Sequence, residues 1–409
     1  MKRGRERGPG TPARHRKRTA RGTGNAPATD EPPARQLPYT PPVHGRAVIE
    51  DTVVRLPQQQ RGTGPAPART DGREHRYDVD LLRLVCSATI MVGHVGALFI
   101  HATGNDPANG AGSYWAGHVA EAVNPFAVPV YFAIAGWAVL VGAPPRDGAH
   151  MQRRIVRNLV PLFVWTGVYL VWAWLRDRNE RPMTELAADS LFGSVRPAYH
   201  LWFMYDYIPV IALLAFVALL RAGRRPWALG AALLGVAVTP SVLTTAAEVT
   251  GREMPESSWG FGFYAIVYAV VGALLLSLPA GTVRPRWPLW VLLPLSMAGA
   301  LWYNTQVHYV MPNAHLFVAL MCVCVLLLIG RVRVPERWRP ALRTLAGAAL
   351  GAYMVHVLVV EEIAAPLVSP DLGGPAAALL LAGLLVAVTT LSFAASLLWG
   401  RLNLRRLLG

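Results

Sequence analysis

The stretch RLVCSATIMVGH, from Arg83 to His94, lies inside an otherwise apolar run and carries an ionisable side chain at each end. Eleven residues of α-helix turn through about 1,100°, within about 20° of three revolutions, so the two side chains share one face. At about 1.5 Å per residue they are about 16 Å apart along the helix axis. Ionisable groups on one stripe of an apolar helix indicate that the stripe faces a protein interior rather than lipid.

The rest of the chain has the composition of a membrane protein. Of its 409 residues, 53% are hydrophobic and only 15% are charged. Apolar runs of about 20 residues recur, which is the length that spans a bilayer as a helix. We therefore predict an all-α polytopic membrane protein with about ten transmembrane helices. The ten segments are 80–101, 119–142, 155–175, 200–220, 226–248, 259–279, 287–303, 314–330, 344–363 and 376–399.

The distribution of arginine supports this count, because cytoplasmic loops retain Lys and Arg. Alternate connections are rich in Arg, whereas the intervening HATGNDPANGAGSYW, NTQVHYVMPN and APLVSPDLGGP contain none. The intervening connection 176–197 has four Arg, offset by four acidic residues. A missed or spurious span would break this alternation. Both termini are therefore predicted to be cytoplasmic. The Arg-rich segments are 146–157, 221–225, 284–286, 331–343 and 401–406.

The chain divides into an N-terminal tail, residues 1–76, and a transmembrane domain, residues 77–409. The tail contains 16 Lys/Arg and 7 Asp/Glu, so it holds most of the net charge of +15. It is rich in Arg, Pro and Gly and poor in apolar residues, which predicts disorder. Its basic cluster suits anionic lipid headgroups or nonspecific contacts with nucleic acid. A solvated tail that only sets the topology is the simpler interpretation.

The ionisable pair of the first helix also has structural explanations. Arg83 lies near the inner boundary, where it could reach headgroups or pair with Asp80 one turn earlier. His94 lies beyond the middle of a hydrocarbon layer about 30 Å thick, too far from either interface to reach it. A hydrogen bond to a neighbouring helix is the structural alternative for His94.

DVDLLRLVCSATIMVGH resembles the first helix of the membrane-bound acyltransferase 3 family, whose hallmark is an Arg, ten residues and a His. Four further motifs are similar to those of the family and follow in the expected order. They are VPVYFAIAGWAVL (128–140), QRRIVRNLVPLFVW (152–165), YHLWFMYDYIPV (199–210) and LGAYMVHVLVV (350–360).

The resemblance covers residues 77–400 and not the tail. YHLWFMYDYI looks most like the branch that O-acetylates surface polysaccharides. Ala135 stands where the family has Ser before Gly136, and Ala352 stands where it has Ser before Tyr353. Roles given to those hydroxyls in relatives are therefore in doubt here.

The resemblance implies transfer of an acyl group, most simply acetyl, from cytoplasmic acyl-CoA to a hydroxyl, often of a sugar facing the cell exterior. CoA is a polyanion, and guanidinium groups suit its phosphates. Arg153, Arg154 and Arg157 are expected at the inner membrane edge with Arg83, and we predict that these four bind CoA. For the three loop arginines, ordinary positive-inside anchoring is the alternative.

We predict that His94 is the general base, because a neutral imidazole can take the proton of an attacking hydroxyl near neutral pH. A covalent acyl-histidine intermediate is the mechanistic alternative. Asp206 lies within its span and is predicted to orient His94 or the acceptor, with a structural hydrogen bond as the alternative. Acceptor binding is expected from His200, Trp202, Tyr205 and His356, the last being the residue most like the family's late-helix His.

Other function classes are less consistent with the sequence. A multi-span small-molecule transporter would show repeated halves and paired broken helices, and neither is visible. Cys322 and Cys324 are two residues apart on a predicted helix and point to nearly opposite sides, so no metal site is indicated. The acceptor is predicted to be a cell-envelope polysaccharide or another sugar, with a secreted natural-product glycoside as the alternative. The bias toward Arg over Lys and the Ala-rich spans suggest a GC-rich bacterial genome, and we expect the protein in the bacterial plasma membrane.

Overall fold

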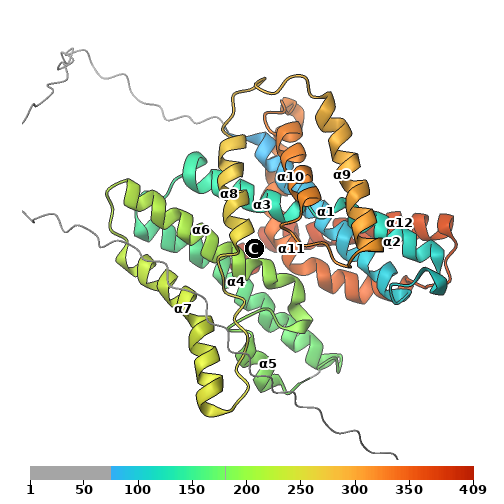
Figure 1. Cartoon of the computed structure of the whole chain (residues 1–409), viewed down its shortest axis with the longest axis horizontal. Helices are drawn as coiled ribbons and strands as arrows, with labels where there is room; N and C mark the ends of the chain where they lie inside the picture. Colours follow the sequence, from blue (N-terminus) through green and yellow to red (C-terminus); the bar gives the residue numbers. More distant parts are fainter. Residues whose placement is uncertain (1–74, 180) are drawn as a thin grey trace, which may run out of the picture. The chain divides into compact units, whose positions relative to one another are not determined.

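The computed structural model describes residues 75–179 and 181–409, so the predicted tail, residues 1–76, lies almost entirely outside the described residues. In the described ranges the chain is helical and contains no β-strand. The main helices are α1 (Tyr77–Ala102), α2 (Ala111–Val123), α3 (Ala127–Trp137), α4 (Gly148–Leu175), α5 (Met183–Asp189), α6 (Trp202–Arg221), α7 (Trp227–Thr250), α8 (Phe263–Leu275), α9 (Trp287–Gln306), α10 (Leu316–Ile329), α11 (Arg339–Val359), α12 (Gly374–Arg401) and α13 (Arg405–Leu408) (Figure 1).

Each of the ten predicted segments coincides with one of these helices or with a pair of them. Seven helical stretches in the described part of the chain are long and apolar enough to cross a membrane. Two others, α8 and α10, are apolar but short. At about 1.5 Å per residue their 13 and 14 residues cover about 20 Å, less than a full hydrocarbon layer. The chain is an all-α polytopic membrane protein.

The second predicted segment differs from the prediction in its start and its continuity. It begins at Ala111 rather than at residue 119, and it is broken into α2 and α3 around Asn124 and Pro125. Proline lacks a backbone N–H and cannot continue the hydrogen-bond ladder of α2, so the chain turns there before α3 begins. α3 continues as a single π-helical turn, η2 (Ala138–Gly142).

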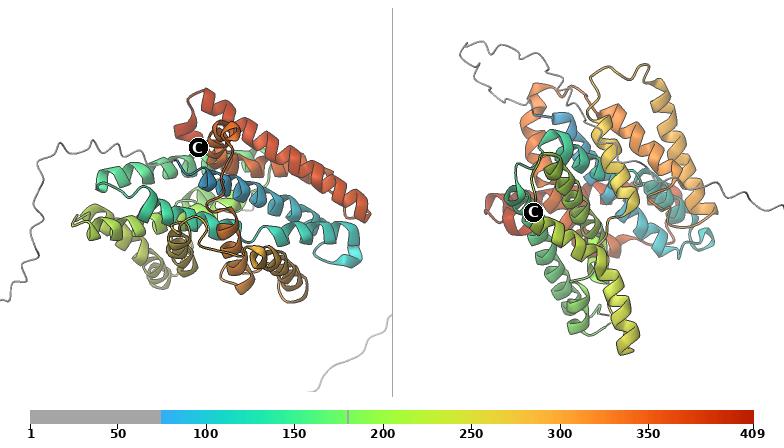
Figure 2. Two further views of the ribbon diagram at one scale, coloured as in Figure 1. Left: turned by 90° about the horizontal axis from the view of Figure 1, so that it is seen from above. Right: turned by 60° about the vertical axis from the view of Figure 1, so that its left-hand side comes forward.

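α1 is the central helix, and it packs against α2, α3, α11 and α12 (Figures 1 and 2). α3 packs on α8 through small residues, because a side chain on Gly136 would overlap the backbone of Ala269. Gly272 meets the backbone of Ala133 in the same way. By contrast, only 6% of the membrane-length window of α7 is buried, which leaves its apolar surface for lipid.

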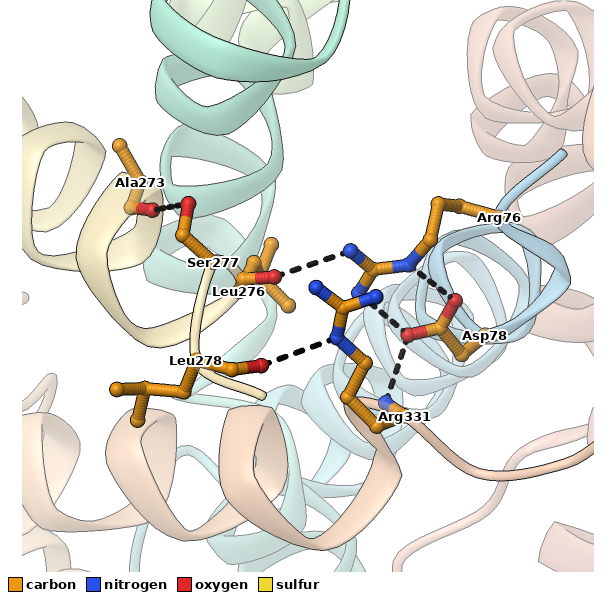
Figure 3. A network of polar contacts seen from close by, with 7 residues as sticks. All are labelled: Arg76, Asp78, Ala273, Leu276, Ser277, Leu278 and Arg331. Carbon is orange, nitrogen blue, oxygen red and sulfur yellow. Dashed lines mark hydrogen bonds and ion pairs between the residues drawn. The ribbon is translucent and has the colours of Figure 1, made fainter. Parts of the chain in front are cut away.

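The helix ends that were predicted to face the cytoplasm meet in a network of polar contacts (Figure 3). Arg76 donates to both oxygens of Asp78, at 2.7 and 2.6 Å, and to the carbonyl oxygen of Leu276, at 3.0 Å. The backbone N–H of Arg331 donates to Asp78 at 2.7 Å, and its side chain donates to the carbonyl of Leu278 at 3.1 Å. The two guanidinium groups thus satisfy carbonyls at the open C-terminal end of α8.

Contacts at the opposite end of the bundle join connections that were predicted to face the exterior. Ser113 at the start of α2 donates to the carbonyl of Ser369, at 2.7 Å. Arg178 after α4 pairs with Glu361 after α11, at 2.9 Å. These contacts agree with the alternation of loops read from the Arg distribution.

The start of α4 follows from its sequence. Asp147 is its N-cap, and its carboxylate accepts from the backbone N–H of His150 at 2.7 Å, satisfying one of the free donors of the first turn. That hydrogen bond holds the pKa of Asp147 below its usual value. The cap fixes where the helix begins and hence which arginines of its second and third turns face inward.

Candidate active site

Two cavities of similar size lie inside the bundle. The first, which we call the arginine cavity, has a volume of about 330 Å³ and is lined by Arg83 of α1 and by Arg154 and Arg157 of α4. The second, the histidine cavity, has about 320 Å³ and is lined by His94 of α1 and by His200. Both volumes are at the small end of the range of ligand pockets. Arg83 and His94, the two ionisable residues on one face of α1, therefore each line a different cavity.

The two cavities share a wall. Ile90, Phe203 and Tyr353 line both of them. Ile90 lies between Arg83 and His94 on the inward stripe of α1, and the hydroxyl of Tyr353 donates to the backbone carbonyl of His200. The three side chains that separate the cavities therefore come from α1, α6 and α11.

The arginine cavity is positively charged. Arg83 pairs with Asp80 at 3.2 Å, as the structural interpretation of Arg83 predicted, and also lines the cavity. Arg154 donates to the carbonyl of Ala143 at 2.8 Å. Arg157 has no carboxylate partner among the described residues, and no Asp or Glu lines this cavity. Three guanidinium groups line the cavity and only one of them, that of Arg83, is paired with a carboxylate, so the excess positive charge suits an anion.

Arg153 is not part of this cavity. It is exposed and does not line it, although its two neighbours Arg154 and Arg157 do. Helical spacing alone does not separate the three, because Arg153 and Arg154 precede Arg157 by four and three residues and lie on either side of it on the helix surface. The cavity lies on the Arg154 side. The sequence prediction treated the three arginines as equivalent, but only two of them enter the cavity.

His94 lies in a cluster of rings, of which His94 and His200 line the histidine cavity and Tyr199 and His356 do not. Its Nδ1 atom is 3.3 Å from the hydroxyl of Tyr199, and its ring centroid is 4.9 Å from that of His356. His356 is in turn 5.2 Å from His200, centroid to centroid. Two of the predicted acceptor-site residues thus lie close to the predicted base. Tyr199 was not predicted, although its place before His200 in the fourth motif was the available signal.

The protonation of His356 follows from its contacts. Its Nδ1 atom is 2.5 Å from the backbone carbonyl of Tyr353. A carbonyl only accepts, so Nδ1 carries the hydrogen, and in the neutral ring Nε2 is an acceptor. That Nε2 atom is buried and has no hydrogen-bond partner among the described residues.

The residues predicted on α6 are divided between the cavity and the fold. Trp202 lines the histidine cavity. The hydroxyl of Tyr205 donates to the carbonyl of Ser190 at 2.7 Å, and the ring packs on Trp259, so this side chain belongs to the packing of the bundle. Neither Tyr205 nor Asp206 lines either cavity.

Asp206 does not approach His94. It accepts from the hydroxyl of Tyr264 on α8, at 3.3 Å. α6 begins at Trp202, so Asp206 lies one turn deeper along the same face, where α8 packs against α6. This is the structural hydrogen bond that was the alternative for Asp206. His94 is contacted by Tyr199 instead.

The motif departures can be placed as well. Ala135 lines the arginine cavity, so the missing hydroxyl would have faced that cavity. Ala352 is fully buried among the apolar residues that α1, α11 and α12 share. Within the described residues no group of three or more His, Cys, Asp or Glu side chains has an arrangement that could hold a metal ion.

These features define a class: a polytopic all-α membrane protein with an anion-binding cavity and a histidine cavity on either side of a shared wall. The acyltransferase 3 family model, described as an acyltransferase domain, matches residues 76–399. The chain belongs to this family and is a membrane acyltransferase. Searches of curated proteins and of solved structures gave no significant match.

Proposed function

We propose that the protein moves an acyl group, in the first place acetyl, from acyl-CoA in the arginine cavity to a hydroxyl of an acceptor sugar in the histidine cavity. The observation that carries this proposal is the shared wall between the two cavities, with Arg83 on one side and His94 on the other. The donor approaches from the cytoplasm, and the acceptor faces the cell exterior.

The donor side follows from charge. The phosphates of CoA need cations, and forked guanidinium groups meet phosphate oxygens with two hydrogen bonds at once. Arg154 and Arg157 are suited to this role, because neither is neutralised by a carboxylate of the cavity. The cavity is too small for a whole CoA molecule, so it takes the arm that carries the thioester toward the wall.

Transfer at the wall is direct. An imidazole nitrogen of His94 takes the proton of the sugar hydroxyl as its oxygen attacks the thioester carbonyl carbon. The new C–O bond forms, the C–S bond breaks, and the thiolate of CoA leaves with the proton that His94 has taken. The contact with Tyr199 at 3.3 Å orients the ring. For the thioester to reach His94, the side chains of Phe203 and Tyr353 must part.

The finer assignments belong to the same proposal. Surface polysaccharide of a bacterial plasma membrane is the first choice of acceptor, and a secreted natural-product glycoside is the second. An acyl-histidine intermediate would give the same product in two steps. Trapping of labelled protein when no acceptor is present would favour that second mechanism. Membership in an acyltransferase family makes a transporter the weaker alternative.

The test uses full-length protein in lipid nanodiscs with radiolabelled acetyl-CoA and a panel of methyl hexopyranosides. His94→Ala is expected to lower acetyl transfer by about 10²- to 10⁴-fold, the range of general-base assistance. His101→Ala is the matched control, because His101 lies on the same helix at its exposed end. Full transfer activity in a folded His94→Ala protein would end the proposal.

A further inference from the structure

The histidine cavity contains polar groups that the transfer step does not use. Glu121 of α2 and Asn124 in the break between α2 and α3 both line it. They are three residues apart, so at the end of α2 they lie on neighbouring positions of one face. Pro125 ends the regular helix beside them and also lines the cavity.

Both side chains have an oxygen without a partner. Glu121 accepts from the hydroxyl of Tyr309 through Oε1, at 2.9 Å, whereas its Oε2 is buried with no hydrogen-bond partner among the described residues. The Oδ1 atom of Asn124 is likewise buried and has no hydrogen-bond partner among the described residues. Buried acceptors left unpaired are costly, and those that persist call for an explanation.

The position of Asn124 is linked to the catalytic helix. A Cβ atom on Gly93 would overlap the side chain of Asn124, so the amide packs where only glycine leaves room. Gly93 precedes His94 directly in the sequence. The amide of Asn124 is therefore held against the turn of α1 that carries the proposed base.

The connection between α9 and α10 also lines the cavity, through Val310, Met311 and Asn313. The backbone N–H of Met311 donates to the side chain of Asn304 at 3.0 Å, and Tyr268 donates to the carbonyl of Asn313 at 2.9 Å. These contacts hold the connection in place and bring Tyr309 to Glu121. Trp202 also lines the cavity and adds an apolar aromatic surface beside these polar groups.

The free oxygens specify the chemistry of the ligand. An acceptor atom is satisfied by a donor, and the reacting end of a thioester offers only a carbonyl oxygen and a sulfur. Neighbouring hydroxyls of a sugar offer one donor each. We infer that Glu121 and Asn124 bind hydroxyls adjacent to the one that is acylated, so the acceptor is a sugar or other polyol with neighbouring hydroxyls. This inference rests on the proposed acyl transfer.

The matched change is Glu121→Gln. A glutamine of the same shape keeps an oxygen for the Tyr309 hydroxyl and puts an N–H donor in place of the free oxygen. A purely structural role of Glu121 would alter folding but not the preference for an acceptor. Glu185→Gln, at an exposed position of α5, is the control.

The assay uses the full-length protein in nanodiscs, acetyl-CoA, and three acceptor probes: methyl hexopyranosides, cis-cyclohexane-1,2-diol and cyclohexanol. Glu121→Gln is expected to raise KM for the glycosides and the diol by at least about tenfold, which is the weight of a hydrogen bond to a charged group. KM for acetyl-CoA should stay within about twofold, and the wild-type preference for the diol over cyclohexanol should disappear. If Glu121→Gln fails to fold, Asn124→Ala is the second variant, and it is also expected to raise KM for the glycosides and the diol.

The outcomes separate this inference from the proposed function. An unchanged acceptor KM in folded Glu121→Gln overturns the inference, while His94-dependent transfer upholds the proposed function. A wild-type protein that acetylates cyclohexanol as readily as the diol overturns the acceptor class alone. Absence of His94-dependent acetyl-CoA turnover with every probe overturns both.

Discussion

His94 on α1 and His356 on α11 face each other with ring centroids 4.9 Å apart, although 262 positions separate them in the sequence. His356 donates from Nδ1 to the carbonyl of Tyr353, which leaves an unpaired acceptor at Nε2. The predicted base thus has a second imidazole beside it that is locked in one tautomer. This pairing brings His356, the residue most like the family's late-helix His, beside the proposed base.

We predict that His356 positions His94. His356→Ala should lower kcat by about tenfold to hundredfold, the effect of a small misplacement of a reacting group, with KM for acetyl-CoA unchanged. Steady-state kinetics and a pH–rate profile test this, because a positioning role changes kcat and the shape of the profile together. An unaltered kcat would show that the second imidazole serves packing only.

The arginine cavity predicts a difference between neighbouring residues of one helix. Arg157→Ala and Arg154→Ala should each raise KM for acetyl-CoA by about 10- to 100-fold, the weight of a hydrogen bond to a charged group. Arg153→Ala should leave it unchanged, because Arg153 lies outside the cavity. The measurement is KM at several salt concentrations. Equal effects of all three substitutions would instead point to general electrostatic anchoring.

The polar network at the ends of α1, α8 and α10 predicts a large contribution to stability. Asp78 is 5% exposed, pairs with the guanidinium of Arg76 and accepts from the backbone N–H of Arg331, so Asp78→Ala leaves one charge and one backbone donor without their partner. A loss of about 3–5 kcal/mol is expected, as for other broken buried pairs. Glu336→Gln is the control, because its pair with Arg339 is exposed and worth about 0–1 kcal/mol. Thermal unfolding in detergent compares the two variants.

The close approach of α3 and α8 predicts a steric limit at Gly136. Gly136→Ala should cost about 1–3 kcal/mol or more by overpacking, because its methyl group would meet the backbone of Ala269. Gly167→Ala on α4 is the matched control, since nothing lies within 4 Å of its added Cβ. Yield of monodisperse protein and its melting temperature measure the effect. Equal tolerance of both changes would contradict the packing described for α3.

The fold was largely predictable because local signals suffice for it. Apolar runs placed the ten segments, and alternation of Arg-rich connections agreed with the contacts at the two ends of the bundle. The start of the second segment was wrong by eight residues, because the stretch GSYWAGH between Ala111 and Val119 mixes polar, small and aromatic residues and is only moderately apolar. Its break at Asn124 and Pro125 was not predicted, although proline within an apolar run was a visible signal.

The candidate site was predictable where the residues lie on one helix. Periodicity alone put Arg83 and His94 on one face, and the structure gives each of them a cavity. Periodicity could not have separated Arg153 from Arg154 and Arg157, because Arg153 and Arg157 are four residues apart and lie near one face. Which arginines enter the cavity depends on the helices that pack against α4. Asp206 was linked to His94 because it lies within its span, and that argument does not say which neighbouring helix its side chain meets.

The sequence by itself determined where the long apolar helices lie, which stripe of α1 turns inward and to which family the pattern is similar, because hydropathy, charge and helical period are local properties of the chain. Only the tertiary structure decided that Tyr199 and His356 surround His94, that Tyr264 takes Asp206, and that Glu121 and Asn124 enter the histidine cavity. Those contacts depend on how distant helices cross, and crossing is set by side-chain packing along their whole length.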